Sequence, residues 1–228
     1  MLVREHMTPD PISVGQDASI VEAAKLMKEK EVRRFPVLRG NELIGIVTDR
    51  DLRSAAPSEV ISFDAEERQL MPELHDLLAK VKIKDVMSRE VVTVGPDQTI
   101  VAAAQLMLEH RISGIPVADS RGRMLGIITE TDIFKVLVDA SGLSSGKTTF
   151  ALHLEDRTGS IKQVADVIRA HGARLAGLFT SYALADPQFR RVYIRIGDLP
   201  AEKLQALEQE LRGQFEVLYV AHDDVTAA

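Results

Sequence analysis

Two Thr-x-x-Asp pairs are the residues of this sequence best suited to chemistry. Thr48 and Asp51 end the run Gly-Ile-Val-Thr-Asp-Arg-Asp, and Thr129 and Asp132 end the similar run Gly-Ile-Ile-Thr-Glu-Thr-Asp. In both runs an apolar, strand-like stretch stops at the Thr just as a helical pattern begins. Each pair is therefore predicted at a helix N-terminus, where unpaired backbone N–H groups and the positive end of the helix dipole favour negative charge.

Two roles fit such a pair. In a capping box, the Thr hydroxyl accepts a hydrogen bond from the backbone N–H three residues later, and the Asp carboxylate accepts one from the backbone N–H of the Thr. In a binding site, the Thr and the helix N-terminus hold a phosphate, while the carboxylate accepts hydrogen bonds from two ribose hydroxyls. For one pair alone the capping role is favoured, because such caps occur on many helices.

The two pairs belong to two copies of an internal repeat. When residues 7–37 are aligned with residues 87–117 at a constant offset of 80, 13 of the 31 positions are identical. After one additional residue in the second turn, the alignment continues through both Thr-x-x-Asp pairs. Each copy predicts the order strand, helix, strand, turn, strand, helix.

The elements of the first copy can be placed from its pattern. A helix is predicted from Asp17-Ala18-Ser19 onward, because Ile20, Ala23, Ala24 and Met27 have the i, i+3, i+4, i+7 spacing of an apolar helix face. A hairpin is predicted over residues 35–47, with its turn at 39–41. The second copy repeats both predictions.

Composition limits the function. The 228 residues carry a net charge of −6, which argues against a nucleic-acid-binding surface. The absence of Cys excludes disulfides, thiolate catalysis and Cys-based zinc sites, and the six scattered His residues do not have metal-ligand spacing. No apolar segment reaches membrane-spanning length, so a cytoplasmic protein without a membrane or nucleic-acid partner is expected.

A connecting helix is predicted between the copies. Residues 58–80 have no counterpart in the repeat, and an apolar stripe follows Asp64 with helical spacing. Its members are Leu70, Met71, Leu74, Leu77, Leu78 and Val81.

The segment Ser-Gly-Leu-Ser-Ser-Gly-Lys-Thr at 141–148 invites comparison with a phosphate-binding P-loop. It has three residues between Gly142 and Gly146, where that loop requires four, and it follows a helical pattern instead of a strand. A flexible Gly/Ser linker is therefore expected. Nucleotide processing through Lys147 stays as an alternative that loss of ATP turnover in Lys147→Ala would support.

The remaining residues, 149–228, predict a β-α-β-β-α-β order, which is a ferredoxin-like plan. A strand precedes the turn at 156–159, and a helix follows it as far as Gly172. Two strands are predicted over 175–184 and 192–196, then a helix from Pro200 that stops at Gly213, and a last strand over 215–220.

The duplicated pattern resembles a tandem pair of CBS domains, also called a Bateman module. The resemblance implies an α+β fold of two β-α-β-β-α units in a pseudo-twofold pair, with clefts for AMP, ADP, ATP or related adenosyl ligands. In this resemblance Thr48 and Thr129 would meet phosphate, and Asp51 and Asp132 would meet ribose. The backbone beside adenine would come from Ile12, Ser13, Arg34, Phe35 and Pro36 in one copy and from Val92, Thr93, Gly114, Ile115 and Pro116 in the other.

The copies differ in charge where a phosphate would bind. The first has Arg33, Arg34 and Arg50, and the second has Ser113, Gly114 and Thr131 at the corresponding positions. Arginine makes charge-assisted hydrogen bonds to phosphate. One hypothesis is that the first cleft prefers more highly phosphorylated ligands or is the only one occupied.

The C-terminal part resembles an ACT domain, a small module that senses amino acids in metabolic regulators. The match is the turn after Leu154, with Thr158 where the family pattern often has Pro. The resemblance implies that the turn and the following helix N-terminus hold a ligand carboxylate near Asp156, Thr158, Gly159, Ser160 and Ile161. Alternatively, Gly159 only permits a tight turn and the domain serves dimerisation.

The combined order resembles the acetoin-utilisation AcuB group. The predicted domains are 1–57 and 81–140 for the two CBS units, 58–80 for the connecting helix, 141–148 for the linker and 149–228 for the ACT-like part. Without a nucleophile and base, paired acids or a metal cluster, no catalytic or metal-binding residues are assigned. The expectation is a non-catalytic homodimeric regulator of an unknown partner, and the alternative is a structural oligomerisation subunit without ligand.

Overall fold

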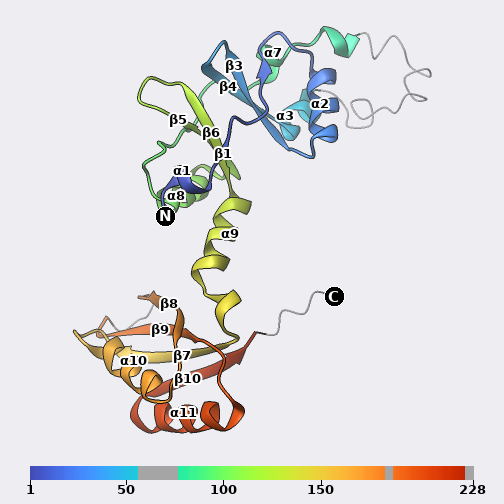
Figure 1. Ribbon diagram of the computed structural model, residues 1–228. Coiled ribbons are helices and arrows are strands. Elements are labelled where there is room, and N and C mark those ends of the chain that lie inside the picture. Colours follow the sequence, from blue (N-terminus) through green and yellow to red (C-terminus); the bar gives the residue numbers. More distant parts are fainter. Residues whose placement is uncertain (56–76, 183–186, 224–228) are drawn as a thin grey trace. The chain divides into compact units, whose positions relative to one another are not determined.

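The computed structural model describes residues 1–55, 77–182 and 187–223. The chain divides into two compact units, Met1–Ile133 and Phe134–Ala228 (Figure 1). The first unit contains both copies of the repeat as far as Ile133, and the second unit begins within the last helix of the second copy. Most of the second unit follows the Gly/Ser segment.

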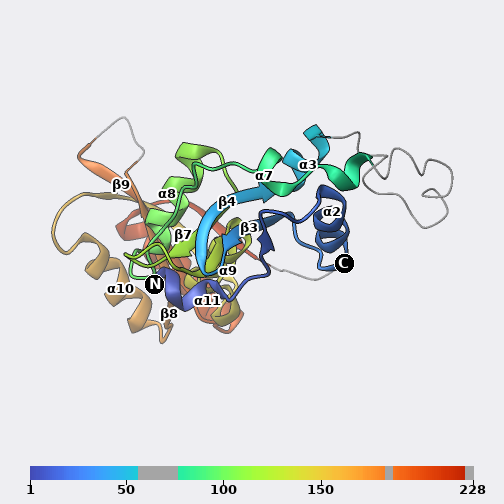
Figure 2. The same cartoon turned by 90° about the horizontal axis from the view of Figure 1, so that it is seen from above.

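The first repeat has the predicted order of elements, and a parallel pair joins β2 to β3 while an antiparallel hairpin joins β3 to β4. The helices α2 and α3 contact each other beside this sheet (Figure 2). The elements are β2 Val14–Gly15, α2 Ile20–Glu29, β3 Arg34–Arg39, β4 Glu42–Thr48 and α3 Asp49–Ala55.

The second repeat copies this arrangement. A parallel bridge from Val94 to Val117 takes the place of the β2–β3 pair. The hairpin follows, with the same irregularity in its register as the first hairpin has. The elements are α8 Ile100–His110, β5 Gly114–Ala118, β6 Met124–Thr129 and α9 Glu130–Ala140.

The predicted apolar helix faces form the cores. Ile20, Ala23 and Met27 are buried against Phe35 and Val47 of the sheet. Ile100, Ala103 and Met107 are buried in the same way in the second repeat. The period of the apolar residues therefore gave the buried faces correctly, because burial of apolar area is the main favourable term that holds these helices on their sheets.

Each repeat receives its leading segment from the other repeat. The short helix α1 (Val3–His6) and strand β1 (Thr8–Pro9) lie on the second repeat, where β1 pairs with β6. The short helix α7 (Ile83–Val86) lies on the first repeat. The contacts match across the two halves: Val3 N–H donates to Gln98 O at 2.9 Å, and Ile83 N–H donates to Ala18 O at 2.9 Å. This exchange relates the repeats by a pseudo-twofold arrangement.

The exchange explains the Gly at the start of each Gly-Ile-x-Thr run. A Cβ atom built on Gly45 would lie 2.6 Å from Met87 Sδ and 3.0 Å from Ser88 O. A Cβ atom on Gly126 would lie 2.7 Å from Met7 Sδ and from Thr8 O. A side chain at either position would therefore collide with the segment that crosses from the other repeat.

The N-cap of α2 allows a test of how much a single helix cap contributes to the stability of the first unit. The buried Ser19 hydroxyl accepts from Glu22 N–H at 3.2 Å, and the Glu22 carboxylate accepts from Ser19 N–H at 2.8 Å. We expect Ser19→Ala to lower the free energy of unfolding by about 1 kcal/mol, because one N–H loses its acceptor. Urea unfolding followed by circular dichroism measures the change.

Thr99→Ala is the matched control for this prediction. Thr99 caps α8 by accepting from Ala102 N–H at 3.1 Å, but Ala102 cannot complete the reciprocal half of the box. Thr99 is also exposed, whereas Ser19 is buried and its hydroxyl additionally donates to the Glu22 carboxylate at 2.9 Å, so the loss of Thr99 should cost less than the loss of Ser19. A larger destabilisation by Thr99→Ala would contradict the importance assigned to the buried Ser19 hydroxyl.

Most of the predicted connecting helix lies outside the described residues, including Leu70, Met71 and Leu74. Residues 77–80 are helical, and there Leu78 is buried in the core of the first repeat while Leu77 is exposed. The stripe is therefore observed only at its C-terminal end.

The second unit has the predicted β-α-β-β-α-β order. Its antiparallel sheet has the strand order β10-β7-β9-β8, so that the first and third strands lie in the centre. The helices pack on the sheet around a core that includes Phe150, Leu152, Ile168, Ile194 and Leu207. The elements are β7 Thr148–Glu155, α10 Ser160–Ala170, β8 Leu175–Ser181, β9 Phe189–Ile196, α11 Ala201–Gln214 and β10 Glu216–His222.

Of the two helix ends predicted in this unit, one agrees with the structure and one does not. Gly172 follows α10 with a φ of 82°, which confirms its role as a helix stop. The predicted stop at Gly213 is wrong, because α11 continues to Gln214 and ends where Phe215 becomes extended. The predicted strand end at Leu184 lies outside the described residues.

The expected flexible Gly/Ser linker is instead a packed turn. Leu143–Ser145 forms a 3-10 helix, and Arg195 donates to Gly146 O at 3.1 Å. A Cβ atom on Gly142 would lie 2.3 Å from Ala176 O, so Gly is needed here for close backbone approach. Thr148 then begins strand β7, whereas a P-loop would lead into a helix, so the P-loop alternative does not fit.

Candidate functional site

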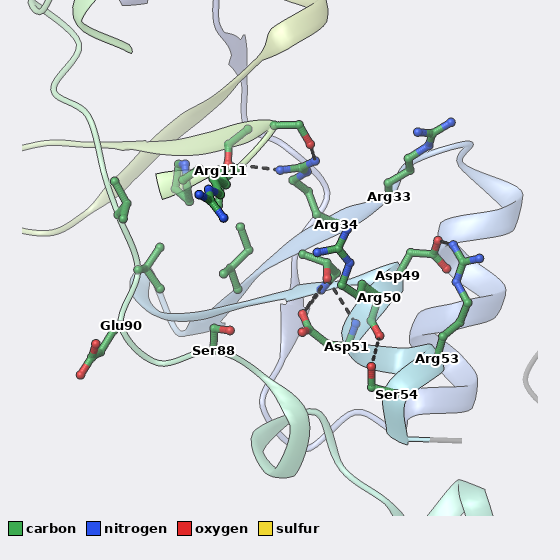
Figure 3. Close-up of a pocket in the computed structure, with 18 residues that line it drawn as sticks. Arg33, Arg34, Asp49, Arg50, Asp51, Arg53, Ser54, Ser88, Glu90 and Arg111 are labelled. Carbon is green, nitrogen blue, oxygen red and sulfur yellow. Dashed lines mark hydrogen bonds and ion pairs between the residues drawn. The ribbon is translucent and has the colours of Figure 1, made fainter. Parts of the chain in front are cut away.

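A cavity of about 750 Å³ lies in the first unit, where the end of β4 and the start of α3 face the second repeat (Figure 3). Its volume is in the range of small-molecule binding sites. We call it the Asp51 cavity. The predicted residues that line it are Arg33, Arg34, Thr48, Arg50 and Asp51 from the first repeat and Val92, Gly114 and Pro116 from the second.

The Asp51 cavity therefore joins the first Thr-x-x-Asp pair to the adenine-flanking backbone of the second copy. The pseudo-twofold exchange places residues 88–92 beside β4, since Ser88 pairs with Ile46. Both residues line the cavity, together with Val91 and Ile112. The sequence did not predict which parts of the two copies would share a cleft.

The other predicted nucleotide-binding residues do not line this cavity. Phe35 and Ile115 are fully buried in the cores, because alternate residues of a strand point to opposite faces. Thr129 and Asp132 lie at the start of α9. The remaining members of this group are Ile12, Ser13, Pro36 and Thr93, and their role stays a prediction.

Both Thr-x-x-Asp pairs form capping boxes. Asp51 Oδ2 accepts from Thr48 N–H at 2.8 Å and from Thr48 Oγ1 at 2.7 Å. The corresponding distances from Thr129 to Asp132 Oδ2 are 2.9 and 2.6 Å. Within the described residues these bonds use only Oδ2 of each carboxylate, and a carboxylate has acceptor capacity on both oxygens. The cap therefore leaves Asp51 able to accept from a ligand as well.

Arg34 of the first repeat is held by the second repeat. Its guanidinium donates to Gly114 O at 3.3 Å and to the Ser113 hydroxyl. Gly114 occupies the position equivalent to Arg34, and a Cβ atom there would lie 3.0 Å from Arg34 Nη1. Because Gly114 has no side chain, it leaves the space beside it to the side chain of Arg34. Desolvation by burial lowers the pKa of Arg34, while the Glu130 carboxylate acts in the opposite direction.

The cavity is rich in positive charge. Arg53 forms an ion pair with Asp49, so this pair contributes no net charge. Arg33, Arg50 and Arg111 also line the cavity, and within the described part of the chain no hydrogen bond or ion pair involves their guanidinium groups. Figure 3 shows Arg50 beside Asp51, with Arg33 at the outer edge of the group.

Arg111 was missed by sequence reasoning. It caps the C-terminus of α8 in the left-handed conformation, with a φ of 54°. Its counterpart in the repeat is Glu31, which has a φ of 53°. This reversal of charge between matched positions was visible in the sequence alignment and is the signal that could have found it.

The predicted amino-acid-binding turn lies at the start of α10. Gly159 is the N-cap with a φ of 87°, and no side chain caps this helix end. Arg190 from β9 donates to the buried Ser160 hydroxyl at 3.0 Å and pairs with Asp156 at 3.2 Å. Thr158 is exposed and Ile161 packs against the core. Arg190 is thus a further polar residue at this turn that the sequence did not reveal.

Within the described ranges the chain has neither a membrane-spanning helix nor a group of metal ligands. None of the helices there combines the length and the apolar character needed to cross a membrane. In the same residues no three His, Asp or Glu side chains are grouped so that they could hold a metal ion.

Comparisons with known proteins agree with this architecture. The family model of the CBS domain matches residues 3–58 and 83–139. A CBS domain-containing protein of Dictyostelium discoideum is 31% identical over 139 residues, which are 60% of this chain and 92% of that protein.

Two solved structures are also similar. The structure of a candidate acetoin utilization protein (AcuB) from Vibrio cholerae has a TM-score of 0.51 and 26% identity, and the match covers 63% of this chain and 95% of that one. The CBS domain of a CBS domain-containing membrane protein from Sphaerobacter thermophilus has a TM-score of 0.50 and 29% identity, with 59% and 86% covered. The chain belongs to the CBS domain family and contains a tandem CBS pair.

Proposed function

We propose that this protein is a non-catalytic regulator that binds an adenine nucleotide in the Asp51 cavity. The observation that carries the proposal is the combination of a free carboxylate oxygen on Asp51 with guanidinium groups that have no protein partner among the described residues. A ribose presents two hydroxyl donors and a phosphate presents anionic acceptors. The cavity offers the complementary group for each.

Different residues of the cavity bind the three parts of the nucleotide. Asp51 accepts from the ribose hydroxyls, and Thr48 with the neighbouring arginines holds phosphate. The base lies against Val92 and Pro116 of the second repeat, which supply apolar surface. The AMP, ADP and ATP ligands implied by the CBS resemblance all have these three parts.

Regulation follows from a ligand that contacts both repeats. Such a ligand binds best to one arrangement of the pair, so that its binding shifts the population toward that arrangement. A partner protein that recognises the same arrangement then senses the nucleotide.

A ligand screen by differential scanning calorimetry tests the proposal. A ligand at a hundred times its dissociation constant should stabilise the native state by about 2.7 kcal/mol. We expect an adenine nucleotide to raise the unfolding temperature, while the pyrimidine nucleotide CTP at the same concentration serves as the control. Equal shifts with both would show that the base is not recognised, because CTP has the same ribose and triphosphate as ATP, and no shift with any adenosyl ligand would reject the proposal.

The second unit carries a second proposal, namely an amino-acid site at the turn before α10. The support is the helix N-terminus without a side-chain cap, beside the guanidinium of Arg190. A ligand carboxylate would accept from the first backbone N–H groups of α10. The same calorimetric screen, extended to the amino acids, tests it.

The proposal includes a homodimer. Exposed apolar side chains occur on α8, at Val101 and Leu108, and on the edge strands of the second unit, at Phe179 and Tyr219. Such surface is typical of an interface. Light scattering measures the assembly. A dimer without affinity for any adenosyl ligand or amino acid would support the alternative of a structural oligomerisation subunit.

A further inference from the structure

The arginines of the Asp51 cavity come from both repeats. Arg33 precedes β3 and Arg50 lies in the first turn of α3, whereas Arg111 lies at the end of α8. The acidic side chains that line the cavity are Asp49, Asp51 and Glu90, and Asp49 is already paired with Arg53. The cavity therefore carries an excess of positive charge.

The equivalent positions in the other half of the pair do not have this charge. Arg33, Arg50 and Arg111 correspond to Ser113, Thr131 and Glu31, respectively. Three positive charges are thus replaced by a single negative charge. Because the two repeats share their fold and their capping boxes, the difference in ligand binding between the two halves should come mainly from these charges.

We propose that the Asp51 cavity selects adenine nucleoside di- or triphosphates over the monophosphate and over uncharged adenosyl ligands, with Arg111 as a specificity residue supplied by the second repeat. The inference rests on the proposed function and adds the ligand class to it. A chain of phosphates can contact several guanidinium groups at once, while a single phosphate can satisfy fewer of them. Adenosine satisfies none.

The charges also set the stoichiometry. A polyphosphate placed beside Glu31 would meet repulsion where the Asp51 cavity offers Arg111. We therefore infer that one polyphosphate nucleotide binds per chain. Arg111 lies at the C-cap of α8 with a left-handed backbone, and its guanidinium group makes no hydrogen bond or ion pair within the described residues although the residue lines the cavity.

Titration calorimetry of the full chain with ATP, ADP, AMP and adenosine tests this inference. We expect the affinity to fall in that order, with one site per chain for ATP. Arg111→Gln should weaken ATP binding by about tenfold, as expected for the loss of a charge-assisted hydrogen bond. The same variant should leave the affinity for adenosine unchanged, which shows that its cavity is intact.

Glu31→Gln is the matched control, because it removes a charge at the equivalent position of the other repeat. It should leave the affinity for ATP within about twofold of the wild type. If all four ligands bind equally and Arg111→Gln has no effect, the inference is wrong but the proposed function stands. If none of the four binds, the proposed function itself is wrong.

Discussion

The variant Asp51→Ala is expected to lose affinity for adenosine by about a hundredfold or more. A carboxylate that accepts from two ribose hydroxyls makes two charge-assisted hydrogen bonds, each worth about 1.5–3 kcal/mol. Their combined loss corresponds to at least two orders of magnitude in the dissociation constant. Adenosine is the right probe because it has the ribose without the phosphate, so that the arginines of the cavity do not contribute. Titration calorimetry measures the affinity.

The repeat provides a control for the structural role of this carboxylate. Asp132 makes the same bonds to Thr129 as Asp51 makes to Thr48. Both variants therefore remove a capping box, and each should lower the free energy of unfolding by about 1 kcal/mol. Only Asp51→Ala should affect binding in the Asp51 cavity. If Asp51→Ala binds adenosine as well as the wild type does, the pair is a helix cap and nothing more.

The variant Gly146→Ala is expected to destabilise the second unit by about 3 kcal/mol. A Cβ atom on Gly146 would lie 1.8 Å from Ile196 O and 2.6 Å from its carbonyl carbon. Ile196 is the last residue of the central strand β9 and pairs with both β7 and β8. The backbone therefore cannot move aside without breaking strand pairing, and overpacking of this kind is costly.

The tyrosines give this experiment a specific readout. The chain has three Tyr and no Trp, and all three Tyr residues lie in the second unit, at 182, 193 and 219. Tyrosine fluorescence during urea unfolding therefore reports on the unit that contains Gly146. Destabilisation of the first unit alone would leave this signal unchanged.

Gly213→Ala is the opposite control in the same unit. Gly213 lies within α11, and no atom lies within 4 Å of a Cβ atom built there. Alanine should increase the free energy of unfolding by about 0.5 kcal/mol, because it favours the helix and restricts the unfolded chain. An equal loss of stability in both variants would mean that the close approach at Gly146 has no particular cost.

The sequence by itself determined the local structure of both units and the duplicate nature of the first. The apolar period of α2, with Ile20, Ala23 and Met27, predicted which face is buried. The predicted turn at 39–41 and the predicted helix start at Asp17-Ala18-Ser19 indicated where elements begin and end. These features depend on neighbours within a few residues, so the chain records them directly. The β-α-β-β-α-β order of the second unit followed in the same way.

Only the tertiary structure decided which residues meet across the repeats. The packing of the two repeats brings Arg111 and Val92 to the cavity of Asp51, and the exchange of leading segments requires Gly at positions 45 and 126. The tertiary structure also shows that the Gly residues at 142 and 146 allow close packing of backbones, where composition had indicated a flexible linker. The physical reason is that these contacts join residues far apart in the chain. Local propensity and periodicity describe how a segment folds but not which distant surface it will cover.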